Sequence, residues 1–273
     1  MSNKKFFFMA GLQRSGATVL SSILNQNPDI YCAPSSPLFP MLADTAKSYN
    51  LPQNVDYDRT SGIDAVLKNM ANNFYSDHNE KYIIDKNHWW PIPMGVDIMY
   101  KYITQDVKII CPVRDIVEVL ASFNTIVEKN KYKNKENVID KGALEFTHPD
   151  KAMPDRRADF LMMPNQDIST HLYGMGFAKQ PEFRHMFHFI EYNDIVSNPE
   201  KVLKDLYDYL EIDEFDHIFE GLKTEVPAKS VTGIYDLHKV NPKLERKSVD
   251  PKDIFSEDTI RRYSGLEFWR DLK

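Results

Sequence analysis

The stretch from Phe6 to Leu20 (FFFMAGLQRSGATVL) decides the fold of this 273-residue chain. An apolar run of strand length ends at Gly11, and a short loop carrying Arg14, a serine and a second glycine leads directly into a helical pattern. A strand, a glycine-bracketed turn and a helix N-terminus form an anion cradle, because free backbone N–H groups and the positive end of the helix dipole converge there. The sequence therefore predicts a site for phosphate or sulfate.

The loop matches a nucleotide-binding P-loop except for its lysine. In the pattern G-x-x-x-x-G-K-[ST], Gly11, Gly16 and Thr18 fit, but Ala17 stands where the lysine that reaches the terminal phosphates belongs. The positive charge lies instead at Arg14, and a guanidinium grips phosphate in bidentate fashion. The loop therefore disfavours metal-assisted γ-phosphoryl transfer. A P-loop kinase of nucleotides or small molecules is the principal alternative.

A second strand pattern ends in a basic residue. Val107–Val113 is typical of a buried strand, Arg114 follows it, and a helical pattern over Ile116–Lys129 carries Ser122. Ligands of open α/β sheets bind outside the carboxyl ends of the strands. Arg114 and Ser122 are therefore candidates to hold a second anionic group.

A third strand pattern, between the other two, ends in Lys86-Asn87-His88. Lysine offers a compact and mobile positive charge, and histidine titrates near neutrality with an unperturbed pKa of about 6.5. The pair suits a transfer reaction in which an acceptor hydroxyl loses its proton while negative charge builds on a leaving group. We therefore expect Lys86 and His88 to be catalytic.

In this order, the three segments resemble the sulfotransferases that use 3'-phosphoadenosine-5'-phosphosulfate (PAPS). Gln13–Thr18 is similar to the family's 5'-phosphosulfate loop, commonly [RK]-S-G-T-T, with alanine in place of one threonine. Val113–Ser122 is similar to the 3'-phosphate site. Lys86–His88 is similar to the Lys-x-His of the cytosolic branch, which implies that His88 is the general base.

Two later segments extend the resemblance to about Trp269. Phe189–Asp194 is similar to the family's [RH]-Y-E-x-L, and Glu245–Ser248 is similar to a basic lid over the cofactor, with serine in place of the usual glycine. The resemblance implies that PAPS and its product PAP are held by Arg14, Ser15, Gly16, Ala17, Thr18, Arg114, Ser122, Tyr192, Arg246 and Lys247.

The tyrosylprotein branch of the family shares the lysine but uses a glutamate as its base. No glutamate occurs between Ser21 and Ala71, the part of the chain where that branch supplies it. Histidine is therefore the better-supported base. An aspartate such as Asp44 is the alternative.

Composition excludes several other classes of protein. The net charge of −6 weighs against nucleic-acid binding. No apolar run is long enough to cross a bilayer, and the N-terminal run is too short for a signal peptide. Cys32 and Cys111 lie in apolar contexts, which is typical of buried reduced thiols in a cytoplasmic protein. No His/Cys cluster has zinc spacing, and the resemblance implies a reaction without a metal.

Alternating strand and helix patterns predict an α/β fold with a mainly parallel sheet covered by helices on both faces. We expect one sulfotransferase domain over residues 1–273, with the P-loop-like fold that the resemblance implies. The expected strands are Phe6–Ala10, Ile30–Cys32, Tyr82–Asp85, Lys108–Val113 and Met186–Glu191. The expected helices are Ala17–Gln26, Ser36–Ser48, Gly62–Tyr75, Val96–Ile103, Ile116–Lys129, Asp167–Ala178 and Pro199–Leu210.

Two irregular segments do not fit this alternation. Long segments without regular structure in a compact domain are often functional. We interpret 131–165 as an insertion on the acceptor side and 226–254 as the cofactor lid. The aromatic candidates for an acceptor pocket are Phe39, Trp89, Trp90 and Tyr173.

Together these features predict a cytoplasmic PAPS-dependent sulfotransferase. It would move a sulfuryl group to a hydroxyl or amine of a small-molecule or peptide acceptor. A catalytically silent module that binds PAP is the second alternative.

Overall fold

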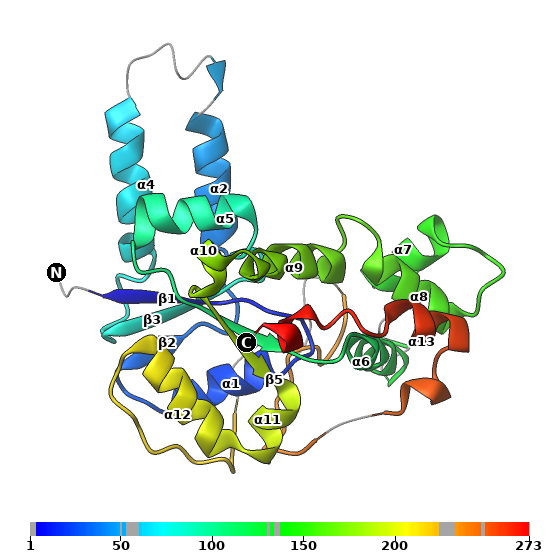
Figure 1. Cartoon of the computed structure of the whole chain (residues 1–273). Coiled ribbons are helices and arrows are strands. Elements are labelled where there is room, and N and C mark those ends of the chain that lie inside the picture. Colours follow the sequence, from blue (N-terminus) through cyan, green and yellow to red (C-terminus); the bar gives the residue numbers. More distant parts are fainter. Residues whose placement is uncertain are drawn as a thin grey trace.

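Five parallel strands form one sheet in the order β2-β3-β1-β4-β5 (Figure 1). They are β1 (Lys5–Met9), β2 (Ile30–Cys32), β3 (Tyr82–Lys86), β4 (Ile109–Val113) and β5 (Phe187–Glu191). This computed structural model describes residues 4–49, 51–52, 60–129, 132–133, 137–223, 233–246 and 249–272. Each strand lies where the sequence predicts one, and the predicted α/β class is confirmed.

The central position of β1 brings the three sequence motifs together. β1 pairs with β3 on one side, where Met9 lies opposite Lys86, and with β4 on the other side. Because the three strands are parallel, their carboxyl ends lie at one edge of the sheet. The loop after β1, the end of β3 and Arg114 after β4 therefore meet at the edge where open α/β sheets bind ligands.

Each face of the sheet carries its own hydrophobic layer. Phe6 and Phe8 pack into one cluster and Phe7 and Met9 into the other, because successive strand side chains point to opposite faces. Burial on both faces explains why the strands are continuous apolar runs. The face of Phe7 is covered by α1 (Ala17–Leu24), α11 (Tyr192–Ser197) and α12 (Pro199–Leu210).

The remaining helices lie mainly on the other face and beside the sheet (Figure 1). They are α2 (Leu38–Tyr49), α4 (Thr60–Phe74), α5 (Pro93–Ile98), α6 (Ile116–Lys129), α7 (Val138–Phe146), α8 (Met153–Met162), α9 (Asp167–Met175), α10 (Pro181–Arg184) and α13 (Glu257–Tyr263). A π-helical turn (Met99–Ile103) continues α5, and a 3-10 turn (Gly176–Lys179) continues α9. Two short 3-10 helices, Pro251–Asp253 and Phe268–Asp271, complete the set.

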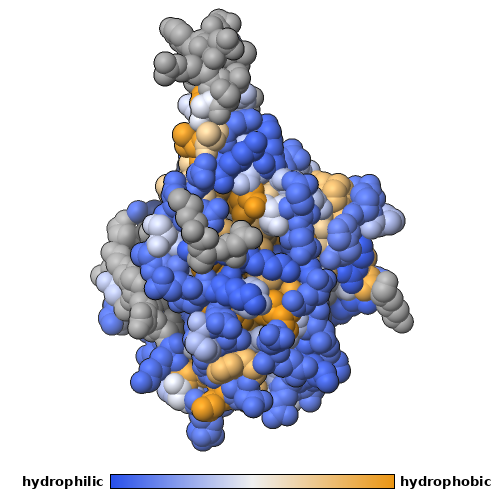
Figure 2. Space-filling model, turned by 90° about the vertical axis from the view of Figure 1, so that its left-hand side faces the viewer, coloured by the Kyte–Doolittle hydropathy of each residue, from blue (hydrophilic) through white to orange (hydrophobic). Residues whose placement is uncertain are grey.

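Helices α2 and α4 project side by side from the body of the molecule (Figure 1). On the face that Figure 2 shows, hydrophilic residues predominate and hydrophobic ones appear in small separate patches. In the described part of the chain, no helix has both the length and the apolar character needed to cross a bilayer. Cys32 and Cys111 are both buried and unpaired, as the sequence predicts.

The segment 131–165, predicted to be irregular, contains two helices, so that prediction is wrong. Asn137 caps α7 by accepting a hydrogen bond from the backbone N–H of Asp140. Pro154 stands in the first turn of α8, where proline is tolerated because the first N–H groups have no partner in the helix. The two helices pack closely, because a Cβ at Gly142 would lie 2.1 Å from the Phe160 ring.

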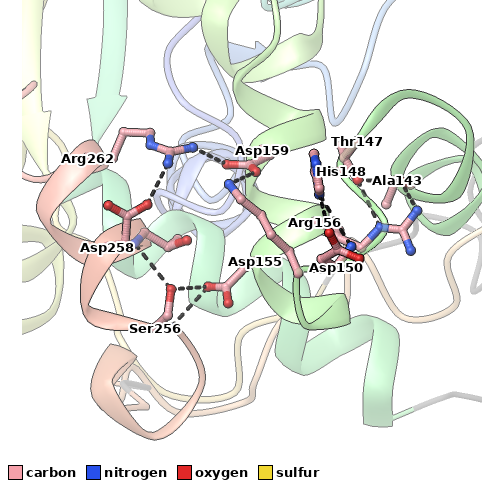
Figure 3. Close-up of polar contacts among 12 residues, drawn as sticks. Ala143, Thr147, His148, Asp150, Asp155, Arg156, Asp159, Ser256, Asp258 and Arg262 are labelled. Atoms are coloured by element: carbon pink, nitrogen blue, oxygen red, sulfur yellow. Dashed lines mark hydrogen bonds and ion pairs between the residues drawn. The ribbon is translucent and has the colours of Figure 1, made fainter.

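Polar contacts fasten α8 to the C-terminal helix α13 (Figure 3). Asp155 accepts hydrogen bonds from the backbone N–H and the hydroxyl of Ser256, at 3.0 and 3.1 Å. Asp159 accepts from Arg262 and from the hydroxyl of Tyr263, at 3.0 and 2.8 Å. The helices of 131–165 are therefore anchored to the body of the protein.

Candidate active site

A cavity of about 900 Å³ opens at the carboxyl ends of β1, β3 and β4. The loop after β1, the end of β3, helix α6 and the segment 236–246 contribute to its wall. Of the residues that the sequence predicts, those lining it are Arg14, Gly16, Ala17, Thr18, Lys86, His88, Arg114, Ser122, Tyr192 and Arg246. Ser15 is fully buried and does not line the cavity, and Lys247 lies outside the described residues.

The anion loop depends on two glycines. A Cβ at Gly11 would lie 2.3 Å from the carbonyl oxygen of Pro112, so only glycine lets the loop pass this close to β4. Gly16 has a φ of 87° at the N-cap of α1, a left-handed conformation that favours glycine. The turn directs the first amides of α1, which have no partner within the helix, toward the cavity.

Arg14 connects the anion loop to α6 and to the segment above the cavity. Its Nε donates to the hydroxyl of Ser122 at 3.1 Å, and its guanidinium also donates to the carbonyl of Leu237. Burial and the neighbouring Arg114 lower the pKa of Arg14 to about 10. The residues that the sequence assigns to two different anionic groups are therefore in direct contact.

Lys86 is the last residue of β3 and is only 4% exposed. Its Nζ donates to the Thr18 hydroxyl at 3.3 Å, and no carboxylate among the described residues forms an ion pair with it. Burial lowers the pKa of Lys86 to about 8. A buried ammonium without a counter-charge is costly, so this position favours an anionic ligand.

His88 is held in one tautomer by the anion loop. Its Nδ1 lies 2.8 Å from the carbonyl oxygen of Gly11. Because a carbonyl only accepts, Nδ1 carries the proton and Nε2 keeps the lone pair that a base needs. Burial, followed by the nearby His171 and Lys86, lowers the pKa of His88 well below 6.5. The imidazole is therefore neutral at pH 7, and it titrates below the near-neutral range that an unperturbed histidine shows.

Arg114, the basic residue after β4, pairs with a carboxylate that the sequence analysis missed, Glu118. Nε of Arg114 donates to Glu118 at 2.8 Å, and the guanidinium lies 4.5 Å from the centre of the Tyr192 ring. Glu118 also lies 3.4 Å from Arg246, and the Tyr192 hydroxyl donates to the carbonyl of Glu245 at 3.5 Å. Arg114 lies two residues before α6 and Glu118 lies in its first turn, so the spacing of four residues was the available signal for this pair.

Two further histidines line the cavity without belonging to a sequence motif. His171 of α9 is 1% exposed and stacks on His88, with ring centroids 4.7 Å apart. Burial, followed by Lys86 and Arg14, lowers the pKa of His238 to about 4. Nothing in the local sequence around His171 signals this placement, whereas His238 lies in the segment 226–254 that the sequence predicts to cover the cofactor.

The aromatic candidates for an acceptor pocket divide between the cavity and the core. Trp89 lines the cavity, but Trp90 is fully buried in the core, where its indole N–H donates to Asp85 at 2.7 Å. Phe39 packs against Trp90 in the same core, and Tyr173 is 64% exposed on α9. Phe39, Trp90 and Tyr173 therefore do not line this cavity, and Phe39 and Trp90 lie in the core, where aromatic residues are found more often.

Of the two predicted insertions, only one contributes to the cavity. Residues within 236–246 of the predicted lid 226–254 line it, and 226–232 and 247–248 lie outside the described residues. No described residue of 131–165 lines it. Asp44, the alternative base, is exposed on α2, where it pairs with Lys47, and does not line the cavity. In the part of the chain that the structure describes, no three His, Cys, Asp or Glu side chains gather as a metal site would require.

Acid is expected to destabilise the folded protein through the histidines of the cavity. Burial lowers the pKa of His171 to about 3, whereas histidine in an unfolded chain titrates at about 6.5. The unfolded chain therefore binds a proton that the folded protein does not, so this contribution to stability is present above pH 6.5 and is lost as the pH falls toward 3. His171 alone should lower the free energy of unfolding by about 2 kcal/mol between pH 7.5 and pH 5, measured by urea unfolding.

His171→Phe is the control for this pH dependence, because phenylalanine cannot be protonated. Its loss of stability between the two pH values should be smaller than that of the wild type by about the same 2 kcal/mol. An equal loss in both proteins would contradict the prediction.

Comparison with known proteins identifies the family. The model of the sulfotransferase family matches residues 7–217. In overall structure the chain is similar to the sulfotransferase domain from the curacin biosynthetic pathway, with 17% identity over 99% of this chain and 98% of that one and a TM-score of 0.53. A similar domain from the Synechococcus PCC 7002 olefin synthase is 18% identical over 100% and 90% of the two chains, with a TM-score of 0.48.

No curated protein sequence matches the chain. At 17% identity, the similarity to the curacin domain shows the fold. The family model covers well over half of the 273 residues. The chain therefore belongs to the sulfotransferase family.

Proposed function

We propose that the protein transfers a sulfuryl group from PAPS to a hydroxyl or amine of a small-molecule or peptide acceptor and releases PAP. One observation carries the proposal. Arg14, Lys86 and Arg114, which follow or end three neighbouring strands, converge on one cavity beside the N-terminus of α1. Such a concentration of positive charge in an acidic protein suits a ligand with several anionic groups.

The residues of the cavity fit such a donor. The amides of the first turn of α1 with Arg14 would hold the 5'-phosphosulfate, and Arg114 with Ser122 would hold the 3'-phosphate. The cavity volume of about 900 Å³ lies within the range of small-molecule sites. Lys86 lines the cavity as a buried ammonium, and no carboxylate among the described residues pairs with it. A charge left in this state supports an anionic ligand at the loop.

The reaction that we propose needs one proton acceptor and one stabilising charge. Nε2 of His88 takes the proton from the acceptor group, whose oxygen or nitrogen forms the new bond to sulfur. The bond between sulfur and the bridging oxygen of the 5'-phosphate breaks, and its electron pair stays on that oxygen. Lys86 stabilises the negative charge that develops there. PAP and the sulfated acceptor leave, and His88 returns its proton to water.

The two alternatives predict other properties. A kinase would need the P-loop lysine, and Ala17 replaces it. A silent PAP-binding module would use the basic residues, including Lys86, but would need no neutral histidine beside the ligand. His88 therefore favours an enzyme. The two buried free thiols support a cytoplasmic location.

Calorimetry is expected to show tight binding of PAP and weak binding of ATP and ADP. Arg14 in the anion loop and Arg114 after β4 suit a nucleotide with phosphates at both the 5' and the 3' position of the ribose, whereas a 5'-triphosphate would leave Arg114 unused. Titrations of PAP, ATP and ADP with and without Mg²⁺ test this expectation. Adenosine 5'-phosphosulfate, which lacks the 3'-phosphate, is the matched control ligand and should bind more weakly than PAPS.

A magnesium-dependent preference for ATP would favour the kinase instead. Tight binding of PAP without transfer to any of a broad panel of phenols, alcohols, amines and sugars would favour the silent module.

A further inference from the structure

One side of helix α9 faces the proposed catalytic loops. Asp167 accepts a hydrogen bond from the side-chain amide of Gln13 at 3.0 Å. His171, one turn later, stacks on His88. A Cβ at Gly174, after a further three residues, would lie 3.1 Å from the backbone nitrogen of Ile92. The spacing of four and three residues places all three on one side of the helix.

His171 is a buried, neutral ring that acts by packing. It is 1% exposed, and burial lowers its pKa to about 3, so the ring is neutral at pH 7. Its Nδ1 has no hydrogen-bond partner among the described residues. The contact that is specific to this ring is the stack on His88, with centroids 4.7 Å apart and planes inclined by 25°. Offset stacking at this distance is a favourable arrangement of aromatic rings.

His88 needs such a contact, because one hydrogen bond does not fix its ring. The bond from Nδ1 to Gly11 defines the tautomer and the position of one atom. A hydrogen bond tolerates a range of angles, so the plane of the ring, and with it the direction of the Nε2 lone pair, can still tilt about the Cβ–Cγ bond. A flat side chain packed against one face removes this freedom.

We propose that His171 is a positioning residue that holds the plane of the His88 ring, so that Nε2 stays aligned for proton transfer. The proposal rests on the proposed role of His88 as the base. It assigns to α9 the function of aligning the base with the anion loop, since the same helix contacts Gln13 of that loop and the residues that follow His88.

Two replacements of similar volume separate stacking from simple space filling. His171→Phe keeps an aromatic face against His88, whereas His171→Leu fills the space without one. We expect His171→Leu to lower kcat by about 10- to 100-fold, the order of effect that small misplacements of catalytic groups produce. His171→Phe should stay within about threefold of the wild type, because its ring supplies the same stacking face. The KM for PAPS and the Kd for PAP should remain within about twofold in both variants, because position 171 is not among the residues that we propose to hold the donor.

A spectroscopic measurement tests the same proposal without donor or acceptor. Long-range ¹H–¹⁵N NMR spectra of the histidine rings report the tautomer of His88, and ¹³C relaxation of its ring C–H groups reports the motion of the ring. In both variants the Nδ1–H tautomer should persist, because the hydrogen bond to Gly11 remains. In His171→Leu we expect a more mobile ring, whereas in His171→Phe the ring should stay as rigid as in the wild type. If His171→Leu does not fold, His171→Met gives the same ring-free comparison, because methionine fills irregular spaces.

Wild-type kcat and an unchanged mobility of the His88 ring in His171→Leu would overturn the proposal. Equal loss of kcat in the Leu and Phe variants would also overturn it, because it would assign a polar role to His171. Failure of the proposed function would appear separately, as a wild-type protein that does not bind PAP. The NMR comparison of the His88 ring would still decide whether His171 positions it.

Discussion

Replacing His88 by alanine is expected to lower turnover by about 10²–10⁴-fold, the usual effect of removing a general base. The Gly11 carbonyl fixes the proton on Nδ1, which leaves Nε2 as the basic atom. The expected loss lies in kcat with an acceptor present, and the affinity for PAP should change little. Initial rates with radiolabelled PAPS and calorimetry with PAP measure the two quantities.

The pH profile gives a second measure of the same residue. Burial, His171 and Lys86 lower the pKa of His88, so the neutral base persists below pH 6.5. The acidic limb of kcat/KM for the wild type should therefore lie below that of an unperturbed histidine, whose pKa is about 6.5. His148→Ala is the matched control, because its side chain is 67% exposed and lies outside the cavity. Retained activity in His88→Ala would contradict the assignment and leave the fold and the donor site unaffected.

Replacing Lys86 by alanine is expected to lower sulfuryl transfer by about 10²-fold or more, because the ammonium stabilises charge that appears only in the transition state. The affinity for PAP should stay within several-fold, since Arg14 and Arg114 remain. A loss of PAP affinity as large as the loss of rate would show that Lys86 mainly binds the ground state. Lys86→Arg keeps the positive charge on a side chain of different shape, so it should retain part of the rate.

Lys108→Ala is the control for removing a buried lysine. Lys108 is 7% exposed, precedes β4 at the opposite edge of the sheet and pairs with Glu211 at 2.7 Å. The Lys108→Ala variant should have a lower thermal stability than the wild type but the same rate of sulfuryl transfer per folded molecule. The pH dependence supplies a further check, because burial lowers the pKa of Lys86 to about 8. The charged form that the reaction needs is present below this pH, so kcat/KM for PAPS should fall above about pH 8.

Local sequence patterns were sufficient to predict the sheet and the anion loop. The path from Phe6 through Gly11 and Gly16 into α1 depends on short-range rules: an apolar run, glycines at positions of close approach and positive φ, and a helical period. The same rules located β3 and β4, and parallel strands bring their carboxyl ends to one edge. Lys86 and Arg114 therefore reached the cavity as predicted.

The same patterns failed where packing decides the surroundings of a side chain. Trp89 and Trp90 are neighbours in the sequence, yet one lines the cavity and the other lies in the core against Asp85. The helices of 131–165 were missed because the prolines and polar residues of this segment resemble those of a loop. The contacts of α8 with Ser256 and Arg262, far away in the chain, stabilise it.

The sequence by itself determined the family, the motifs at the ends of β1, β3 and β4, and the residues of the anion loop. Only the tertiary structure showed that His171 stacks on His88, that Glu118 lies between Arg114 and Arg246, and that burial lowers the pKa of His88. The physical reason is that a motif is a property of neighbours in the chain. Burial, ring stacking and the pKa of a side chain depend on which distant elements pack around it.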